Sequence, residues 1–332
     1  MKKLLSLALV LVLALSVVAF AAAEAALPKI GVAIYKFDDT FMTGVRNAIE
    51  AAAKDVAEIT MADSLNQQPT QNDQVTLFIG QGMNALAINP VDRTACPEIS
   101  KKAQDDGIPV VYFNREPIAD EMVDFTDWYY VGAKAEESGT MSGELIAEYF
   151  AANPEALGED GVLQYVMLQG EPGHQDAELR TEYSLKALED AGLKVENLAT
   201  DTAMWNRVNA QDKMAAWLTA YGDKIEAVLA NNDDMALGAI EALKAAGYFV
   251  DGKYIPVVGV DATAPALEAL KEGTLLGTVL NDAKNQGRAT LLLTVAAANG
   301  KVAEFTEYEI VDEHYVWVPY QKVTIDNYTQ FE

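Results

Sequence analysis

The chain has 332 residues, half of them hydrophobic, and its 50 acidic and 24 basic side chains give a net charge of −26. So acidic a surface repels nucleic acid and anionic lipid, which argues against partners of either kind. Cys96 is the single cysteine, so no intramolecular disulfide can form. One cysteine and two histidines are too few ligands for an ordinary zinc site.

Residues 1–23 have the pattern of a cleaved secretory signal peptide. Two lysines precede an uncharged apolar run from Leu4 to Phe20, and three alanines then supply the small residues that a signal peptidase reads. The alternative is a membrane anchor, for which this run is at the lower limit of length. We therefore predict export to a periplasmic or other extracytoplasmic space.

Short apolar segments alternate with longer amphipathic ones from residue 30 to residue 298, and the rhythm returns after Tyr129–Gly132. The predicted strands are Ile30–Tyr35, Asn84–Asn89, Pro109–Phe113, Val162–Leu168, Ile225–Ala230, Pro256–Val260 and Thr274–Leu280. The predicted helices are Phe41–Val56, Ala95–Asp106, Ala133–Phe150, Asp176–Ala191, Asn206–Tyr221, Met235–Ala246 and Asp282–Ala297. This alternation predicts an α/β fold with parallel sheets covered by helices on both faces. The length favours two Rossmann-like lobes, and since no Pro/Gly-rich linker is present, several short crossings should join them.

One glycine motif needs a separate interpretation. Residues 80–85 match G-x-G-x-x-A by letters, but they precede a predicted strand, whereas a dinucleotide-binding turn follows one. We predict the end of a helix there.

Polar side chains follow nearly every predicted strand. They are Asp38–Asp39, Asn89, Asn114–Arg115, Asn231–Asn232–Asp233, Asp261 and Asn281–Asp282. Helix capping explains part of this pattern. In open α/β sheets, however, ligands also bind at the edge formed by the carboxyl ends of the strands. Carboxylates and amides can each engage neighbouring hydroxyls, and the aromatic rings of Phe41 and Trp205 lie beside the polar groups in the sequence. These features predict a monosaccharide site.

The chain resembles the galactose/glucose-binding branch of the type I periplasmic sugar-binding proteins, from about Lys29 to Asn327. The segments that carry the resemblance are IGVAIYKFDDTFM from Ile30, QNDQ from Gln71, ALAINPVD from Ala85, FNREP from Phe113, YYVGAKAEESG from Tyr129, GEPGHQDAELR from Gly170, DTAMWN from Asp201, ANNDDMALGA from Ala230, GVDATAPAL from Gly259 and GTVLNDAKNQ from Gly277.

The resemblance implies a role for each matching residue. Asp39 would accept hydrogen bonds near O4 of the sugar, and Phe41 and Trp205 would cover the two ring faces. Polar contacts would come from Asn114, Asn232, Asp261 and Asn281, and contacts to the O6 and anomeric sides from His174, Asp176 and Arg180.

The resemblance also implies how the lobes are built. Residues 28–132 and 284–316 would form the N-terminal lobe, and residues 133–283 and 317–332 the C-terminal lobe. The chain would cross near Gly132–Lys134, Asn281–Lys284 and Val316–Tyr320. The lobes would close on D-glucose or D-galactose and present the closed form to the membrane permease of an ABC importer, with a chemoreceptor as a possible second partner. We expect a monomer.

The chain departs from the family pattern at three places. Thr40 and Arg115 stand where Asn and Lys are common, and both could tune the choice of sugar. The third is the family's calcium loop, for which Asp160, Gln164 and distant Glu226 fit, whereas Ala156 and Gly158 bring no side-chain oxygen. We expect no cofactor and calcium held weakly or not at all.

Alternatives to a glucose or galactose receptor remain open. One is a receptor for another monosaccharide, such as xylose or ribose. Another is a glycoside-acting enzyme that uses Asp39 and Asp261, but their polar neighbours argue for ionised carboxylates, whereas such an enzyme keeps one protonated. A sugar-responsive transcription regulator would need a basic headpiece where this chain has an export signal.

Overall fold

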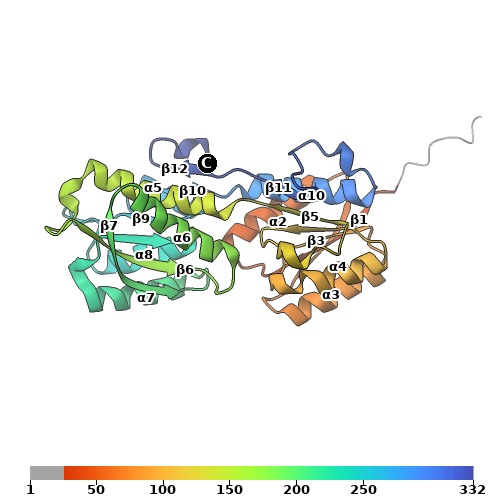
Figure 1. The fold of residues 1–332 in the computed structure, drawn as a ribbon, viewed down its shortest axis with the longest axis horizontal. Coiled ribbons are helices and arrows are strands. Elements are labelled where there is room, and N and C mark those ends of the chain that lie inside the picture. The colour runs from red at the N-terminus through yellow and green to blue at the C-terminus, as the bar shows by residue number, and fades with distance from the viewer. Residues whose placement is uncertain (1–25, 332) are drawn as a thin grey trace, which may run out of the picture.

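The computed structural model describes residues 26–331, which form two α/β lobes side by side (Figure 1). The predicted signal peptide, residues 1–23, lies outside the described residues. No helix within residues 26–331 is both long enough and apolar enough to span a membrane.

The first lobe is built on a six-stranded parallel sheet of strand order β11-β5-β4-β3-β1-β2. Its strands are β1 (Lys29–Ile34), β2 (Glu58–Asp63), β3 (Ala85–Ile88), β4 (Val110–Phe113), β5 (Trp128–Gly132) and β11 (Tyr315–Trp317). One face packs on α2 (Thr40–Ala53) and α10 (Ala283–Ala298), and the other packs on α3 (Gln68–Gly80) and α4 (Cys96–Asp105). β1, β3 and β4 are almost wholly buried because helices cover both faces, which explains their unbroken apolar sequences.

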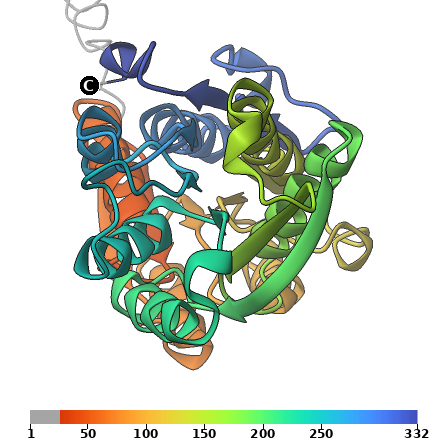
Figure 2. The same cartoon turned by 90° about the vertical axis from the view of Figure 1, so that its left-hand side faces the viewer.

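The second lobe repeats this plan with a parallel sheet of order β7-β6-β8-β9, followed by β10, which pairs antiparallel with β12. Its strands are β6 (Val162–Gln169), β7 (Lys194–Thr202), β8 (Ala227–Ala230), β9 (Val257–Val258), β10 (Thr278–Leu280) and β12 (Gln321–Val323). Its helices are α5 (Ala135–Ala152), α6 (Gln175–Asp190), α7 (Arg207–Tyr221), α8 (Asp233–Ala245) and α9 (Ala264–Lys271). α5 and α6 cover one face and α7, α8 and α9 the other (Figure 2).

The chain changes sheet more than once. It leaves the first sheet after β5, returns between β10 and α10, and passes back between β11 and β12. The residue boundaries predicted for the two lobes remain a prediction.

The predicted elements are all present with modest shifts, and the glycine motif ends α3 at Gly80, as predicted. The strands predicted at Pro256–Val260 and Thr274–Leu280 are shorter, since only β9 and β10 pair within them. Sequence analysis did not assign β2, β5, β7, β11, β12, α3 and α9. β7 is a half-exposed edge strand, so the buried apolar signature is missing. The first half of α3 is polar, and the buried face of the helix includes Gln71.

Candidate ligand-binding cleft

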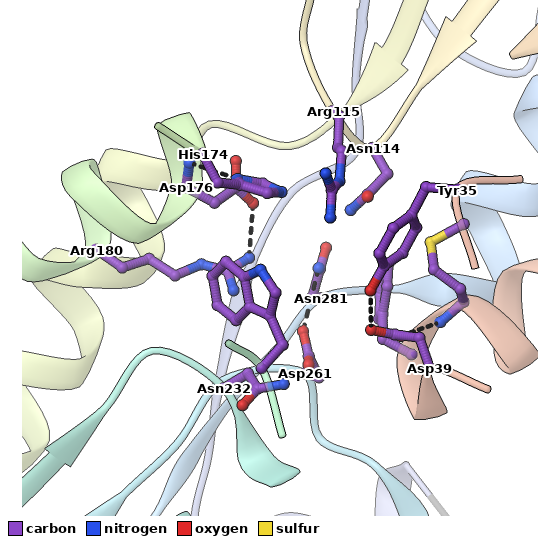
Figure 3. Close-up of a pocket in the computed structure, with 13 residues that line it drawn as sticks. Tyr35, Asp39, Asn114, Arg115, His174, Asp176, Arg180, Asn232, Asp261 and Asn281 are labelled. Carbon is purple, nitrogen blue, oxygen red and sulfur yellow. Dashed lines mark hydrogen bonds and ion pairs between the residues drawn. The ribbon is translucent and has the colours of Figure 1, made fainter. Parts of the chain in front are cut away.

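The residues predicted to bind a ligand all line one cavity between the lobes, of about 40 Å³ of solvent-accessible volume (Figure 3). Each is held just beyond the carboxyl end of a strand or in the first turns of the helix that follows. Asp39 and Phe41 follow β1, Asn114 follows β4, and the second lobe supplies His174, Asp176, Arg180, Trp205, Asn232, Asp261 and Asn281. Their role as ligand contacts remains a prediction, but the structure brings together every one of them.

Asp39 has a structural role as well as a place in the cavity wall. It is the N-cap of α2, where its Oδ1 accepts from the Met42 backbone N–H at 2.8 Å. Its Oδ2 accepts from the Tyr35 hydroxyl at 2.6 Å. A carboxylate oxygen has two lone pairs, so Asp39 can still accept from a ligand hydroxyl.

Asn114, on the same lobe, is held in an unusual backbone conformation. Its φ of 61° lies in the left-handed region, which asparagine tolerates better than most residues. The side-chain Oδ1 accepts from Asn89 Nδ2 at 3.1 Å, which leaves the Asn114 amide N–H₂ as a donor toward the cavity. Asn89 is fully buried and ties β1 to β4, so its position at a strand end has a structural explanation.

His174, Asp176 and Arg180 lie together at the start of α6, on the second lobe. His174 is the N-cap, and its Nδ1 accepts from the Asp176 backbone N–H at 3.1 Å. The ring proton is therefore on Nε2, which can donate. Burial holds the pKa of His174 well below its usual range, and the nearby arginines Arg115 and Arg180 add to this.

Arg180 is 5 % exposed, and its guanidinium is almost fully engaged. It forms an ion pair with Asp176 at 2.9 Å and also donates to the Asn231 carbonyl oxygen and the Tyr320 hydroxyl. Burial raises the pKa of Asp176, and Arg180 opposes that rise. The Arg180 guanidinium and the Asp176 carboxylate therefore place donors and acceptors at fixed positions in the cavity wall.

Asp261 and Asn281 form the floor of the cavity. Asn281 Nδ2 donates to Asp261 Oδ1 at 3.2 Å, and Gln286 Nε2 donates in turn to Asn281 Oδ1. Asp261 has a φ of 124°, and the strain of such a backbone is typical of ligand sites. Asn232, the remaining polar residue, is the N-cap of α8.

The two predicted aromatic residues reach the cavity from different lobes. Phe41 is buried, and Trp205 stands edge-on to His174 with ring centroids 5.1 Å apart. The indole of Trp205 lies directly against Gly170, where a Cβ atom would be 2.1 Å from the ring. Glycine at position 170 is therefore what allows the indole to lie there.

Three residues that line the cavity are absent from the predicted set: Tyr35, Met42 and Arg115. Sequence analysis noted Arg115 at the end of a strand and as a departure from the family pattern, but did not assign it to the site. It is 6 % exposed, its guanidinium lies 3.9 Å from the ring centroid of Tyr35, and its Nη2 forms an ion pair with Glu171 at 2.7 Å. The signal available in the sequence was its place directly after Asn114 at the end of a strand.

The loop that would correspond to a calcium site is a poor fit to the ion. Both carboxylate oxygens of Glu226 accept backbone N–H groups, from Gly158 at 2.6 Å and from Gln164 at 2.7 Å. Asp160 accepts from the Val162 backbone N–H. Within residues 26–331 there is no cluster of three or more His, Cys, Asp or Glu side chains that could hold a metal. Weak or absent calcium binding remains a prediction.

One step of the sequence argument against an enzyme is weakened by the structure. Polar neighbours were expected to keep the cleft carboxylates ionised, but burial raises the pKa of Asp261 well above its usual range, and Arg180 only partly opposes this. The reason is that desolvation disfavours the charge more than the neighbours favour it.

Comparison with known proteins places this arrangement in context. A family model described as a periplasmic binding protein domain matches residues 30–302. The D-galactose/methyl-galactoside binding periplasmic protein MglB of Haemophilus influenzae is 46% identical over 96% of this chain and 98% of its own length. A putative rhizopine-binding protein of Rhizobium meliloti is 34% identical over 91% and 92%. The structure of an ABC transporter solute binding protein of Bacillus halodurans with bound myo-inositol superposes with a TM-score of 0.79 at 34% identity, covering 94% of this chain and 99% of that one.

Proposed function

The chain belongs to the periplasmic binding protein family, and we propose that it is the sugar-binding component of an ABC importer, with D-glucose or D-galactose as its ligand. The observation that carries this proposal is the convergence of the predicted ligand residues, from both lobes, on one cavity. The similarity to a galactose/methyl-galactoside binding protein over nearly the whole chain supports it.

The cavity has the chemistry that a pyranose needs. Ring hydroxyls both donate and accept, and the wall offers the acceptors Asp39, Asp176 and Asp261 beside the donors His174 and Arg180. Phe41 and Trp205 can cover the apolar C–H faces. Each hydrogen bond to an ionised group contributes about 1.5–3 kcal/mol.

The choice of a hexose rests on the side of the cavity formed by α6. His174 and Asn114 offer donors where the family resemblance places O6, a group that a pentopyranose lacks. A pentose such as xylose or ribose is the alternative ligand. Glucose and galactose differ only at O4, and Asp39 can accept from either epimer.

Calorimetric titration of the chain without residues 1–23 tests the ligand. Glucose, galactose, xylose, ribose and arabinose would be compared under one condition. We expect a dissociation constant of about 1 µM or tighter for glucose or galactose. A pentose that binds clearly better than both hexoses would contradict the proposal.

Asp39→Asn tests the site without removing the helix cap, because asparagine caps helices about as well as aspartate. Loss of the charged acceptor should weaken hexose binding by roughly 10- to 100-fold. The matched control is Asp38→Asn, since the Asp38 side chain is 81% exposed and forms an ion pair with Lys36, outside the cavity wall. Equal hexose affinity of the two variants would show that Asp39 does not bind the sugar.

We further propose that the chain is not an enzyme, although Asp261 has a raised pKa. A retaining or inverting glycosidase would place two carboxyl groups across a glycosidic bond, but the cavity that residues of both lobes line is small, at about 40 Å³. Steady release of nitrophenol from a nitrophenyl galactoside, lost in Asp261→Asn, would overturn this.

The remaining parts of the proposal concern place and partners. The family description and the relative's name support an extracytoplasmic location, which the predicted cleavage after residue 23 would produce. Partners would be the membrane permease and, in a motile cell, a chemoreceptor. The covalent mass of the exported protein tests the predicted cleavage. The mass of its particles in solution tests the expected monomer.

A further inference from the structure

The turn that carries Asp261 into the cavity has a strained backbone. Asp261 and Ala262 have successive φ values of 124° and 53°, in the region that residues with a Cβ atom rarely adopt. Such a conformation persists only where the surrounding structure holds it. The contacts that hold residues 260–263 therefore determine where the Asp261 carboxylate lies in the floor of the cavity (Figure 3).

Asp233, the first residue of α8, holds both ends of this turn. Its backbone N–H donates to the Val260 carbonyl oxygen at 2.8 Å, and its Oδ2 accepts from the Thr263 backbone N–H at 2.7 Å. A Cβ atom at Gly259 would lie 2.4 Å from Asp233 Oδ1, so glycine at this position makes room for the carboxylate.

Thr278, on β10, holds the middle of the turn. Its hydroxyl donates to Asp233 Oδ1 at 2.6 Å and accepts from the Ala262 backbone N–H at 3.3 Å. A hydroxyl can donate once and accept as well, so both hydrogen bonds form together. Asp233 and Thr278 therefore form one network that contacts the turn at residues 260, 262 and 263.

Neither helix capping nor contact with a ligand explains the Asp233 carboxylate. Asn232 already caps α8 through the Met235 backbone N–H, and neither Asp233 nor Thr278 is among the residues that line the cavity. Asp233 is fully buried, and burial raises its pKa to about 7, opposed by the hydrogen bonds that its carboxylate accepts. Burying a carboxylate is costly, so its use on this turn indicates that the turn must be held in one place.

We propose that Asp233 and Thr278 are positioning residues for ligand binding, which hold the strained turn so that the Asp261 carboxylate contacts the sugar. This role rests on the proposed function, in which Asp261 contacts the hexose. Two residues outside the cavity wall then contribute to hexose affinity through Asp261.

The test begins with two variants of Thr278. Thr278→Val keeps the size of the side chain but removes its hydroxyl, whereas Thr278→Ser keeps the hydroxyl. Asp233→Asn is the second test of the network, because asparagine offers one acceptor oxygen where two donors approach. Thr294→Val is the matched control, since Thr294 is a fully buried threonine of α10 whose hydroxyl donates to the Thr290 carbonyl oxygen. Hexose affinity is measured by calorimetric titration well below the melting temperature recorded for each variant.

We expect Thr278→Val and Asp233→Asn to weaken hexose binding at least about tenfold, and Thr278→Ser to stay within about threefold of the wild-type chain. Thr294→Val should leave the affinity unchanged. A role in stability alone would lower the melting temperature of Thr278→Val and leave the affinity of the folded chain unchanged. If the wild-type chain binds a hexose and Thr278→Val binds it as well as Thr278→Ser does, the positioning role is wrong and the proposed function stands. If the wild-type chain binds no hexose, the proposed function is overturned, and this role with it.

A double-mutant cycle tests whether the effect passes through Asp261. Adding Thr278→Val to Asp261→Ala should change hexose affinity by less than about threefold, because the carboxylate that the turn positions is already gone. A further loss of about tenfold in the double variant would show that Thr278 acts on binding by another route, and would overturn the proposal.

Discussion

His174 shows how one side chain can serve both the helix and the cleft. Its Nδ1 accepts the Asp176 backbone N–H in the first turn of α6, so the helix itself fixes the tautomer that leaves Nε2–H for a ligand. Burial lowers the pKa of the ring, which keeps it neutral in the physiological range.

The tautomer can be checked directly because the sequence has only two histidines. Long-range ¹H–¹⁵N spectra of the ligand-free chain should show His174 protonated at Nε2 and unchanged between pH 8 and about pH 6, since its lowered pKa lies below that range. His314 is the internal control. Its Nδ1 lies 2.7 Å from the Trp128 carbonyl oxygen, which can only accept, so His314 should show the opposite tautomer. Protonation of His174 near pH 6.5 would contradict this account.

Gly170 determines where the Trp205 indole lies. Gly170→Ala would bring a methyl group within about 2 Å of the indole, so the ring must leave the cavity wall. We expect hexose affinity to fall at least about fivefold, the loss of one stacking contact. Gly80→Ala is the control, because nothing lies within 4 Å of a Cβ at the end of α3. Calorimetry on both variants, with melting temperatures recorded, checks the prediction. Unchanged affinity in Gly170→Ala would mean that Trp205 does not stack on the sugar.

Most elements could be predicted because burial sets their sequence pattern. β3 and β4 are apolar throughout since both faces are covered, and α2 carries its apolar residues on one side. β7 and α3 escaped prediction because burial does not give them such a pattern. β7 is largely exposed, and the buried face of α3 includes the polar Gln71 beside Val75 and Phe78.

Glu226 holds the loop before β6 by hydrogen bonds to its backbone. Glu226, at the start of β8, accepts from the backbone of residues 158 and 164 and so joins the loop to the sheet. These hydrogen bonds are charge-assisted, and they engage the two carboxylate oxygens that a bound cation would otherwise use.

Glu226→Ala should therefore destabilise the second lobe by about 1–3 kcal/mol and lower its melting temperature by several degrees. Calcium added to metal-stripped wild-type chain should produce no binding heat and no change in melting temperature. Glu159→Ala, at an exposed position in the same loop, controls for loss of charge. Tight calcium binding by calorimetry would show that the missing oxygens at Ala156 and Gly158 are supplied from elsewhere.

At the scale of the whole molecule, few polar contacts hold the cleft closed. Glu171 of the second lobe accepts from Arg115 at 2.7 Å and from Asn66 at 3.3 Å, and the Thr40 hydroxyl donates to Asp234 at 2.6 Å. Two of the three family departures, Thr40 and Arg115, thus lie in contacts between the lobes (Figure 3 shows Arg115 beside the cavity). Their effect on sugar choice remains a prediction.

Glu171→Gln removes the ion pair with little change in shape. We expect hexose dissociation to accelerate by roughly 5- to 30-fold, for a loss of about 1–2 kcal/mol in a pair that is partly exposed, with little change in the association rate. Stopped-flow tryptophan fluorescence measures both rates. Glu182→Gln, exposed on α6, is the matched control. Equal dissociation rates in the two variants would show that this ion pair does not hold the lobes together.

The sequence by itself determined the alternation of elements and the residues at the strand ends. Both depend on near neighbours along the chain: a strand's burial sets its apolar pattern, and the chain must turn where the strand ends. It therefore identified most of the residues that line the cavity, but not Tyr35, Met42 or Arg115.

Only the tertiary structure decided which distant residues come into contact and how far their side chains are desolvated. Arg115 reaches Glu171 across 56 positions and Thr40 reaches Asp234 across 194, contacts that no local pattern encodes. Desolvation depends on everything packed around a group, so the raised pKa of Asp261 and the lowered pKa of His174 became evident only once both lobes surrounded them.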